Sequence, residues 1–120
     1  LLMARGLIVD DSKFMRRIIA EIITGAGHVV DGEADNGQDG INLYDKLRPD
    51  FVTMDITMGG KDGINAVKEI KAKNPDAKII VISALNENTI RLNDQKIQAD
   101  IYITKPFTRE DLLNAIDKLL

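Results

Sequence analysis

The residues of this chain that could take part in chemistry stand at the ends of apolar segments: Asp10 and Asp11, Asp55, Ser83 and Lys105. The segments before them are short and apolar and contain many β-branched residues, which is typical of strands buried on both faces of a parallel sheet. Ligands bind such sheets at the carboxyl ends of the strands. We therefore expect three carboxylates, one hydroxyl and one ammonium group to meet at a single rim.

Three carboxylates that lie together in a dry cleft cannot all stay ionised without a cation. The chain has no cysteine, and no histidine stands at these strand ends, so the available ligands are oxygen atoms. Oxygen ligands favour a hard cation such as Mg²⁺, which commonly takes one or two carboxylates together with phosphate oxygens. Lys105 can neutralise a phosphoryl group, Ser83 can donate a hydrogen bond to it, and an aspartate can form an aspartyl phosphate. The residues indicate phosphoryl chemistry.

Two alternating patterns predict the elements that position these residues. Short apolar segments predict five strands, at residues 6–9, 29–34, 51–54, 78–82 and 101–104. Amphipathic stretches after them predict five helices. The helix at residues 86–98 has the weakest pattern, because Asn93 and Asp94 interrupt its apolar spacing. Strict alternation predicts an α/β fold, with a single domain over residues 1–120, one parallel sheet and helices on both of its faces.

Local signals predict where some of these elements begin and end. Ser12 or Asp11 is expected to cap the first helix, and Pro49 to end the second. Thr108 and Asp111 have the spacing of a capping box at the start of the last helix. The strand at residues 29–34 carries two acidic residues and is expected at an edge of the sheet. His28 is expected to be solvated in a turn, and Arg16 and Arg17 to form an exposed helix face.

The composition excludes several classes of function. The 120 residues carry a net charge of −3 with dispersed basic residues, which gives no electrostatic footprint for nucleic acid. The absence of cysteine excludes disulfides, thiolate metal sites and a cysteine nucleophile. No apolar run is long enough to insert into a membrane, so a soluble, cytoplasmic protein is expected. Leu1 and Leu2, which precede Met3, are expected to have no structural role.

Four separated motifs resemble one family, the receiver domains of bacterial and archaeal two-component response regulators. They are Ile8-Val9-Asp10-Asp11-Ser12, Met54-Asp55-Ile56, Ser83-Ala84 and Lys105-Pro106-Phe107, and the resemblance extends from about Arg5 to the end. It implies a flavodoxin-like fold with strand order 2-1-3-4-5. Within the family, the chain looks most like the chemotaxis-type regulators, on the segments Lys13–Arg17, Gly32–Ala34 and Asp55–Met58.

The resemblance also implies a role for each residue of the rim. Asp55 would accept a phosphoryl group from a histidine kinase. Asp10 and Asp11 would hold Mg²⁺ together with Asp55 and the backbone carbonyl of Thr57. Lys105 would pair with the phosphoryl group. Ser83 and Tyr102 would act as a switch that remodels the face of the fourth helix, fifth strand and fifth helix.

That face would then bind a downstream protein, such as a motor or output protein. The implied protein is a phosphoacceptor that supports its own phosphorylation and dephosphorylation, and not an enzyme of multiple turnovers. It is either a free-standing regulator or a receiver domain cut from a longer regulator with a separate output domain.

Two positions depart from the family pattern. Gly59 stands where the family usually has proline, which gives the loop after Asp55 more freedom to lose on ordering, worth ~1 kcal/mol. Gln98 stands where the family usually has glycine, and in a left-handed conformation it would cost roughly 1 kcal/mol relative to glycine.

Two other functions would usually require residues that this chain does not have at the matching positions. An aspartyl-phosphate phosphohydrolase usually has a second acid two residues after the nucleophile, and this chain has Thr57 there. A flavodoxin-like cofactor binder would need a phosphate loop rich in serine and threonine after the first strand, where this chain has Asp10 and Asp11.

Overall fold

A computed structural model describes residues 3–58, 62–85 and 97–120. Its elements, in chain order, are β1 Arg5–Val9, α1 Lys13–Gly25, β2 Val29–Ala34, α2 Gly37–Leu47, β3 Phe51–Met54, α3 Asp62–Lys73, β4 Ile79–Ser83, β5 Ile101–Thr104 and α5 Arg109–Leu119. The strand predictions are confirmed to within one residue at each end. Most of the helix expected at residues 86–98 lies outside the described residues, as does the departure at Gly59.

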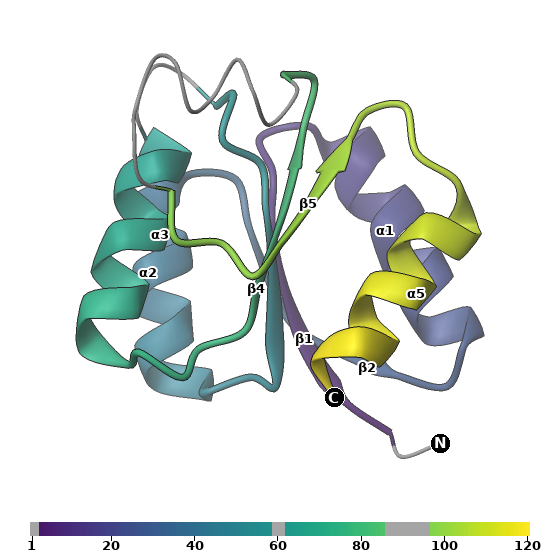
Figure 1. Cartoon of the computed structure of the whole chain (residues 1–120), viewed down its shortest axis with the longest axis horizontal. Helices are drawn as coiled ribbons and strands as arrows, with labels where there is room; N and C mark the ends of the chain where they lie inside the picture. The colour runs from purple at the N-terminus through teal and green to yellow at the C-terminus, as the bar shows by residue number, and fades with distance from the viewer. Residues whose placement is uncertain (1–2, 59–61, 86–96) are drawn as a thin grey trace.

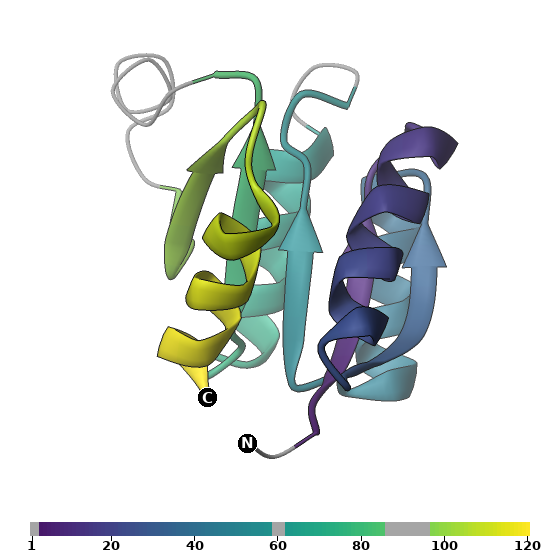
Figure 2. The same ribbon diagram turned by 90° about the vertical axis from the view of Figure 1, so that its right-hand side faces the viewer.

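The five strands form one parallel sheet in the order β2-β1-β3-β4-β5. Helices α2 and α3 cover one face of the sheet, and α1 and α5 cover the other (Figure 1). All strand arrows point toward the same end of the molecule, so the carboxyl ends of the strands share one edge (Figure 2). The predicted fold class and strand order are confirmed, and the polar second strand lies at an edge.

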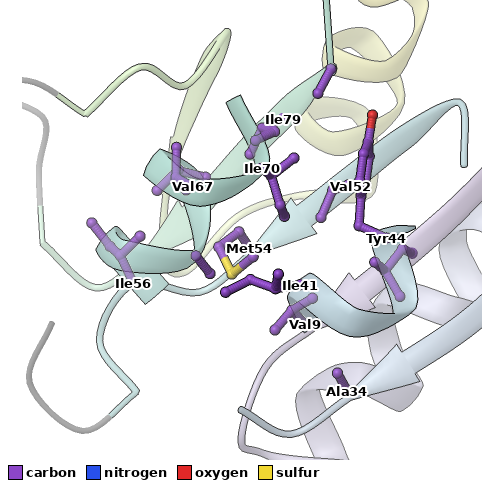
Figure 3. Close-up of a cluster of buried hydrophobic side chains, with 14 of the residues drawn as sticks. Val9, Ala34, Ile41, Tyr44, Val52, Met54, Ile56, Val67, Ile70 and Ile79 are labelled. Carbon is purple, nitrogen blue, oxygen red and sulfur yellow. The ribbon is translucent and has the colours of Figure 1, made fainter. Parts of the chain in front are cut away.

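The sheet separates two apolar cores because successive side chains of a strand point to opposite faces. Leu7, Val9, Val52 and Met54 pack under α2 and α3, and Figure 3 shows part of this cluster around Met54 and Ile41. The alternate residues, which include Ile8 and Phe51, pack under α1 and α5. The same alternation, carried past the strand ends, directs Asp10 and Asp55 toward the face that α1 and α5 cover.

The helix ends follow from local sequence. Ser12 caps α1 by accepting a hydrogen bond from the amide of Met15, and Thr108 and Asp111 form the predicted capping box on α5. Arg48 follows α2 in a left-handed conformation, with φ 45°, because the proline at position 49 disfavours the right-handed helical region there. Among the described non-glycine residues, positive φ occurs at Arg48 alone, so Gln98 does not adopt a left-handed conformation.

Two expectations about single side chains are wrong. His28 is buried, and its Nδ1 accepts a hydrogen bond of 3.0 Å from the amide of Ala4, which begins the path into β1. Its ring meets Phe51 edge-on. Arg16 is also largely covered, with 16% of its side chain exposed, whereas Arg17 is 80% exposed as predicted. In the described part of the chain, no helix is long and apolar enough to cross a membrane.

Candidate functional site

The sheet ladder fixes the backbone of the polar residues that follow the strands. The amide of Asp55 donates to the carbonyl of Val9 (2.9 Å), and the amide of Asp10 donates to the carbonyl of Ala34 (3.0 Å). The amide of Lys105 donates to the carbonyl of Ser83 (2.7 Å). Strands β1, β3 and β5 are therefore each held to a neighbour one residue beyond their own end, and the side chains of these residues start from a rigid frame.

The three predicted carboxylates come together at this edge. Asp10, Asp11 and Asp55 each offer an oxygen atom that lies within 4.8 Å of the others. Asp10 and Asp55 are buried, and Asp11 is exposed. The Nζ atom of Lys105 lies 3.1 Å from Oδ2 of Asp10 and 3.4 Å from Oδ2 of Asp55. Four of the five residues that the sequence placed at the rim thus form one cluster of opposite charges.

Burial dominates the electrostatics of Asp10. It raises the pKa of this carboxyl group, and the nearby charge of Asp55 acts in the same direction. The Ser12 amide, which donates to Oδ1 of Asp10 at 2.9 Å, and the ammonium group of Lys105 oppose the increase without cancelling it. Burial of the Asp10 carboxyl group therefore outweighs the stabilisation that one lysine and the nearby amide give to its charged form.

Thr57 makes contacts with Asp55 that were not predicted. Its amide and its hydroxyl group both donate to Oδ1 of Asp55, at 2.8 and 2.6 Å. Oδ2 faces Lys105 instead, so the two oxygens of this carboxylate have different environments. A carboxylate that accepts from the backbone two residues further on is a common turn arrangement, and the spacing of Asp55 and Thr57 was the available signal.

The two predicted switch residues lie at different places. Ser83 is buried, and its hydroxyl oxygen accepts a hydrogen bond of 3.0 Å from the amide of Leu85. Tyr102 is half-buried against the apolar core under α2 and α3, and its hydroxyl donates to the carbonyl of Ile97 (2.9 Å). Ser83 therefore stands at the rim, and Tyr102 on β5 reaches to the chain segment that leads into that strand.

The donors at this rim suit a hard divalent cation. The cluster offers oxygen ligands, two of them on buried carboxylates and one on a carboxylate open to solvent. Mg²⁺ takes one or two carboxylates in this way and keeps several of its waters, for which the exposed side of Asp11 leaves room. The residues present therefore fit Mg²⁺, in agreement with the expectation from the sequence.

Comparisons with known proteins agree with this geometry. The profile of the family described as response regulator receiver domain matches residues 7–117. The chemotaxis protein CheY of Thermotoga maritima is 46% identical over 115 residues, which are 96% of each chain.

Solved structures are similar over nearly the whole chain. The response regulator TrrA of Thermotoga maritima, in complex with Mg²⁺ and BeF, has a TM-score of 0.88 at 33% identity and covers 98% of this chain and 100% of its own. CheY in the CheX-CheY-BeF₃-Mg²⁺ complex of Borrelia burgdorferi has a TM-score of 0.88 at 31% identity, with 96% and 87% covered. A family match over most of the sequence, relatives of similar length and a shared fold show that the chain is a CheY-like member of the response regulator receiver domain family.

Proposed function

We propose that the chain is a phosphorylation-switched signalling domain in which Asp55 accepts a phosphoryl group from a histidine kinase. The observation that carries this proposal is the position of Lys105. Its ammonium group lies between the buried carboxylates of Asp10 and Asp55, at the rim where all three acids converge. A lysine in this place can neutralise an incoming phosphoryl group, because both carboxylates are held by other contacts as well.

The proposed transfer uses the two different oxygens of Asp55. Oδ1 is engaged by Thr57, so Oδ2, which faces Lys105, is the atom we expect to attack phosphorus. The new O–P bond forms as the N–P bond of the kinase phosphohistidine breaks, and the imidazole nitrogen keeps the electron pair. Mg²⁺, held by Asp10, Asp11, Asp55 and the Thr57 carbonyl, would supply charge neutralisation for the phosphoryl oxygens.

Ser83 and Tyr102 are the proposed readout of this reaction. Ser83 would turn its hydroxyl toward the phosphoryl group and exchange its present bond from the Leu85 amide. Tyr102 stands beside a groove of about 470 Å³ along β5 and α5, which includes Asn114 and Lys118 in its lining. We propose that this face binds a protein target, such as a motor or output protein, and that the system is of the chemotaxis type.

The proposal describes one receiver domain over residues 1–120, either free-standing or part of a longer regulator. It acts by binding partners, and it supports its own phosphorylation and dephosphorylation. A phosphohydrolase of multiple turnovers usually has an acid at the position of Thr57. The threonine there holds the nucleophile in place and has no group that titrates in the required range.

The test is labelling with a small phosphodonor. The chain is incubated with Mg²⁺ and acetyl phosphate, and its intact mass is expected to increase by one phosphoryl group. Asp55→Asn should abolish the increase, and Asp117→Asn, which changes an exposed aspartate on α5, should leave it unchanged. Labelling that persists in Asp55→Asn, or no labelling of the parent chain, would overturn the assignment.

A further inference from the structure

Arg16 is a largely covered cation of α1, with 16% of its side chain exposed, and it reaches back to the end of β1. Helix α1 packs across β1 and β2 (Figure 2), and Arg16 lies in its first turns. One guanidinium nitrogen donates to the backbone carbonyl of Asp10 at 2.7 Å, and Nε donates to Glu33 of β2 at 3.2 Å. The sequence pattern placed this arginine on an exposed face, so these contacts were not expected from it.

The carbonyl that Arg16 holds belongs to the peptide between two carboxylates of the cluster. Asp10 is already fixed at three other points. Its amide donates to Ala34, its Oδ1 accepts from Ser12, and its Oδ2 accepts from Lys105. The bond from Arg16 fixes the remaining polar atom of the residue, and with it the plane of the Asp10–Asp11 peptide.

That plane decides where the side chain of Asp11 leaves the backbone. A peptide unit moves as a rigid plane about the two soft dihedrals on either side of it. Asp11 is exposed, so the packing that orients Asp10 and Asp55 does not orient it. Without the arginine, the Asp10–Asp11 peptide loses the hydrogen bond to its own carbonyl, and the third carboxylate is held less firmly relative to the first two.

We propose that Arg16 is a positioning residue for the divalent-cation site and acts through the Asp10 carbonyl. This role requires the several N–H donors of the planar guanidinium group, which contact the Asp10 carbonyl and Glu33 at the same time. This inference rests on the proposed function, because it assumes that the three aspartates bind Mg²⁺. Glu33 orients the guanidinium group from the other side. Groups outside the ligand set that orient metal ligands commonly change affinity by about 10–100-fold when they are removed.

Charge alone gives the opposite expectation. Arg16 is a cation close to a site for a divalent cation, so its removal would favour Mg²⁺ binding if the arginine acted only through its field. Positioning predicts weaker binding instead. The chain also provides a matched control, because Arg17 is an adjacent arginine that is 80% exposed and, among the described residues, pairs with Glu21 at 3.9 Å.

The experiment is a titration with Mg²⁺ that follows backbone amide chemical shifts in the folded parent and three variants. Arg16→Met is expected to weaken binding about tenfold, the low end of the range for such groups, because Arg16 acts through the backbone. Arg17→Met should bind Mg²⁺ as tightly as the parent or slightly tighter. Arg16→Lys keeps the charge but not the planar fork, and should fall between the parent and Arg16→Met.

The Mg²⁺ affinities of the variants decide whether Arg16 positions the cation site. Arg16→Met that binds Mg²⁺ as tightly as the parent, or more tightly, overturns the inference and leaves the proposed function standing. If Arg16→Met fails to fold, Arg16→Lys decides, and parental affinity in that variant overturns the inference. A parent chain that binds no Mg²⁺ removes the proposed cation site, and the inference with it. Weaker binding in both Arg16 variants with parental binding in Arg17→Met supports it.

Discussion

Gly63 gives the sharpest prediction about how the turn after the proposed phosphoacceptor is held. Gly63 lies in the first turn of helix α3, directly against the backbone of Asp55 and Ile56. A Cβ atom on Gly63 would lie 2.2 Å from the carbonyl oxygen of Asp55 and 2.6 Å from Cα of Ile56. Both neighbours are backbone atoms, so no rotation of a side chain relieves the overlap. Gly63→Ala must push α3 away from the turn or displace Asp55.

The expected cost follows from two opposing terms. Overpacking against atoms that cannot move costs about 3 kcal/mol, the upper part of the usual range. Alanine is favoured over glycine inside a helix by ~1 kcal/mol. The net loss in free energy of unfolding is therefore ~2 kcal/mol, which corresponds to a fall of about 8 °C in Tm for a domain of this size.

Gly25→Ala is the matched control. Gly25 is the last residue of α1, and a Cβ atom there would first meet the end of the flexible Arg109 side chain, at 3.2 Å. This variant should be neutral or more stable by up to ~1 kcal/mol. Urea unfolding followed by far-UV circular dichroism measures both, and acetyl phosphate labelling shows whether Asp55 has moved. Equal urea midpoints for Gly63→Ala and the parent would show that Gly63 does not lie this close to the backbone of Asp55 and Ile56.

Three further predictions concern charge, metal and a buried ring. The pKa of Asp10 is higher in the folded chain than its ordinary value of 3.8. The protonated carboxyl group therefore contributes its full stabilisation below about pH 3.8, and this stabilisation is lost as the pH rises through the folded-state pKa. Without metal, Asp10→Asn should therefore become more stable relative to the parent as the pH rises over that range, as measured by urea unfolding midpoints. If the parent becomes more stable relative to Asp10→Asn instead, the pKa of Asp10 is not raised by folding. Mg²⁺ at about ten times its Kd should add ~1.4 kcal/mol of stability, seen in thermal scans, and Asp11→Ala should remove this gain at little cost of its own, since the side chain is exposed. His28→Phe keeps a ring against Phe51 but removes the acceptor of the Ala4 amide, and should cost about 1–3 kcal/mol; faster hydrogen exchange of that amide would check the cause, and parental stability would show that the bond is not needed.

Much of the fold and of the rim could be predicted because both depend on local features of the sequence. A buried parallel strand is a short apolar run, and a polar residue directly after it marks the end where ligands bind. Asp55 after Phe51–Met54 and Lys105 after Ile101–Thr104 have this arrangement, and the structure brings them to 3.4 Å. Capping signals were equally local, as the Thr108–Asp111 box demonstrates.

The contacts that could not be predicted depend on direction or on distant partners. His28 is buried because the amide of Ala4, 24 residues away, needs an acceptor. Arg16 lies on the polar side of a regular helical pattern, yet side chains in a helix lean toward its N-terminus. An arginine in the first turns of α1 therefore extends over the end of β1, where a carbonyl group is available. Periodicity gives the side of a helix and not the reach of a long side chain.

The rim has a charge imbalance that the rest of the sheet must stabilise. Three carboxylates and one ammonium group have a formal charge of −2 when all are ionised (−3 + 1), and two of the carboxylates are buried. Burial is the main cause of the raised pKa of Asp10, and the neighbouring charge of Asp55 adds to it. A divalent cation would bring this sum to zero, whereas a phosphoryl group arriving first would add further negative charge to a site that already lacks positive charge. Within the proposed function, the cation must therefore be present before transfer, and phosphorylation should depend on Mg²⁺ more steeply than folding does. The backbone bonds of Asp10, Asp55 and Lys105 to neighbouring strands explain how the fold keeps these charges together without a bound cation.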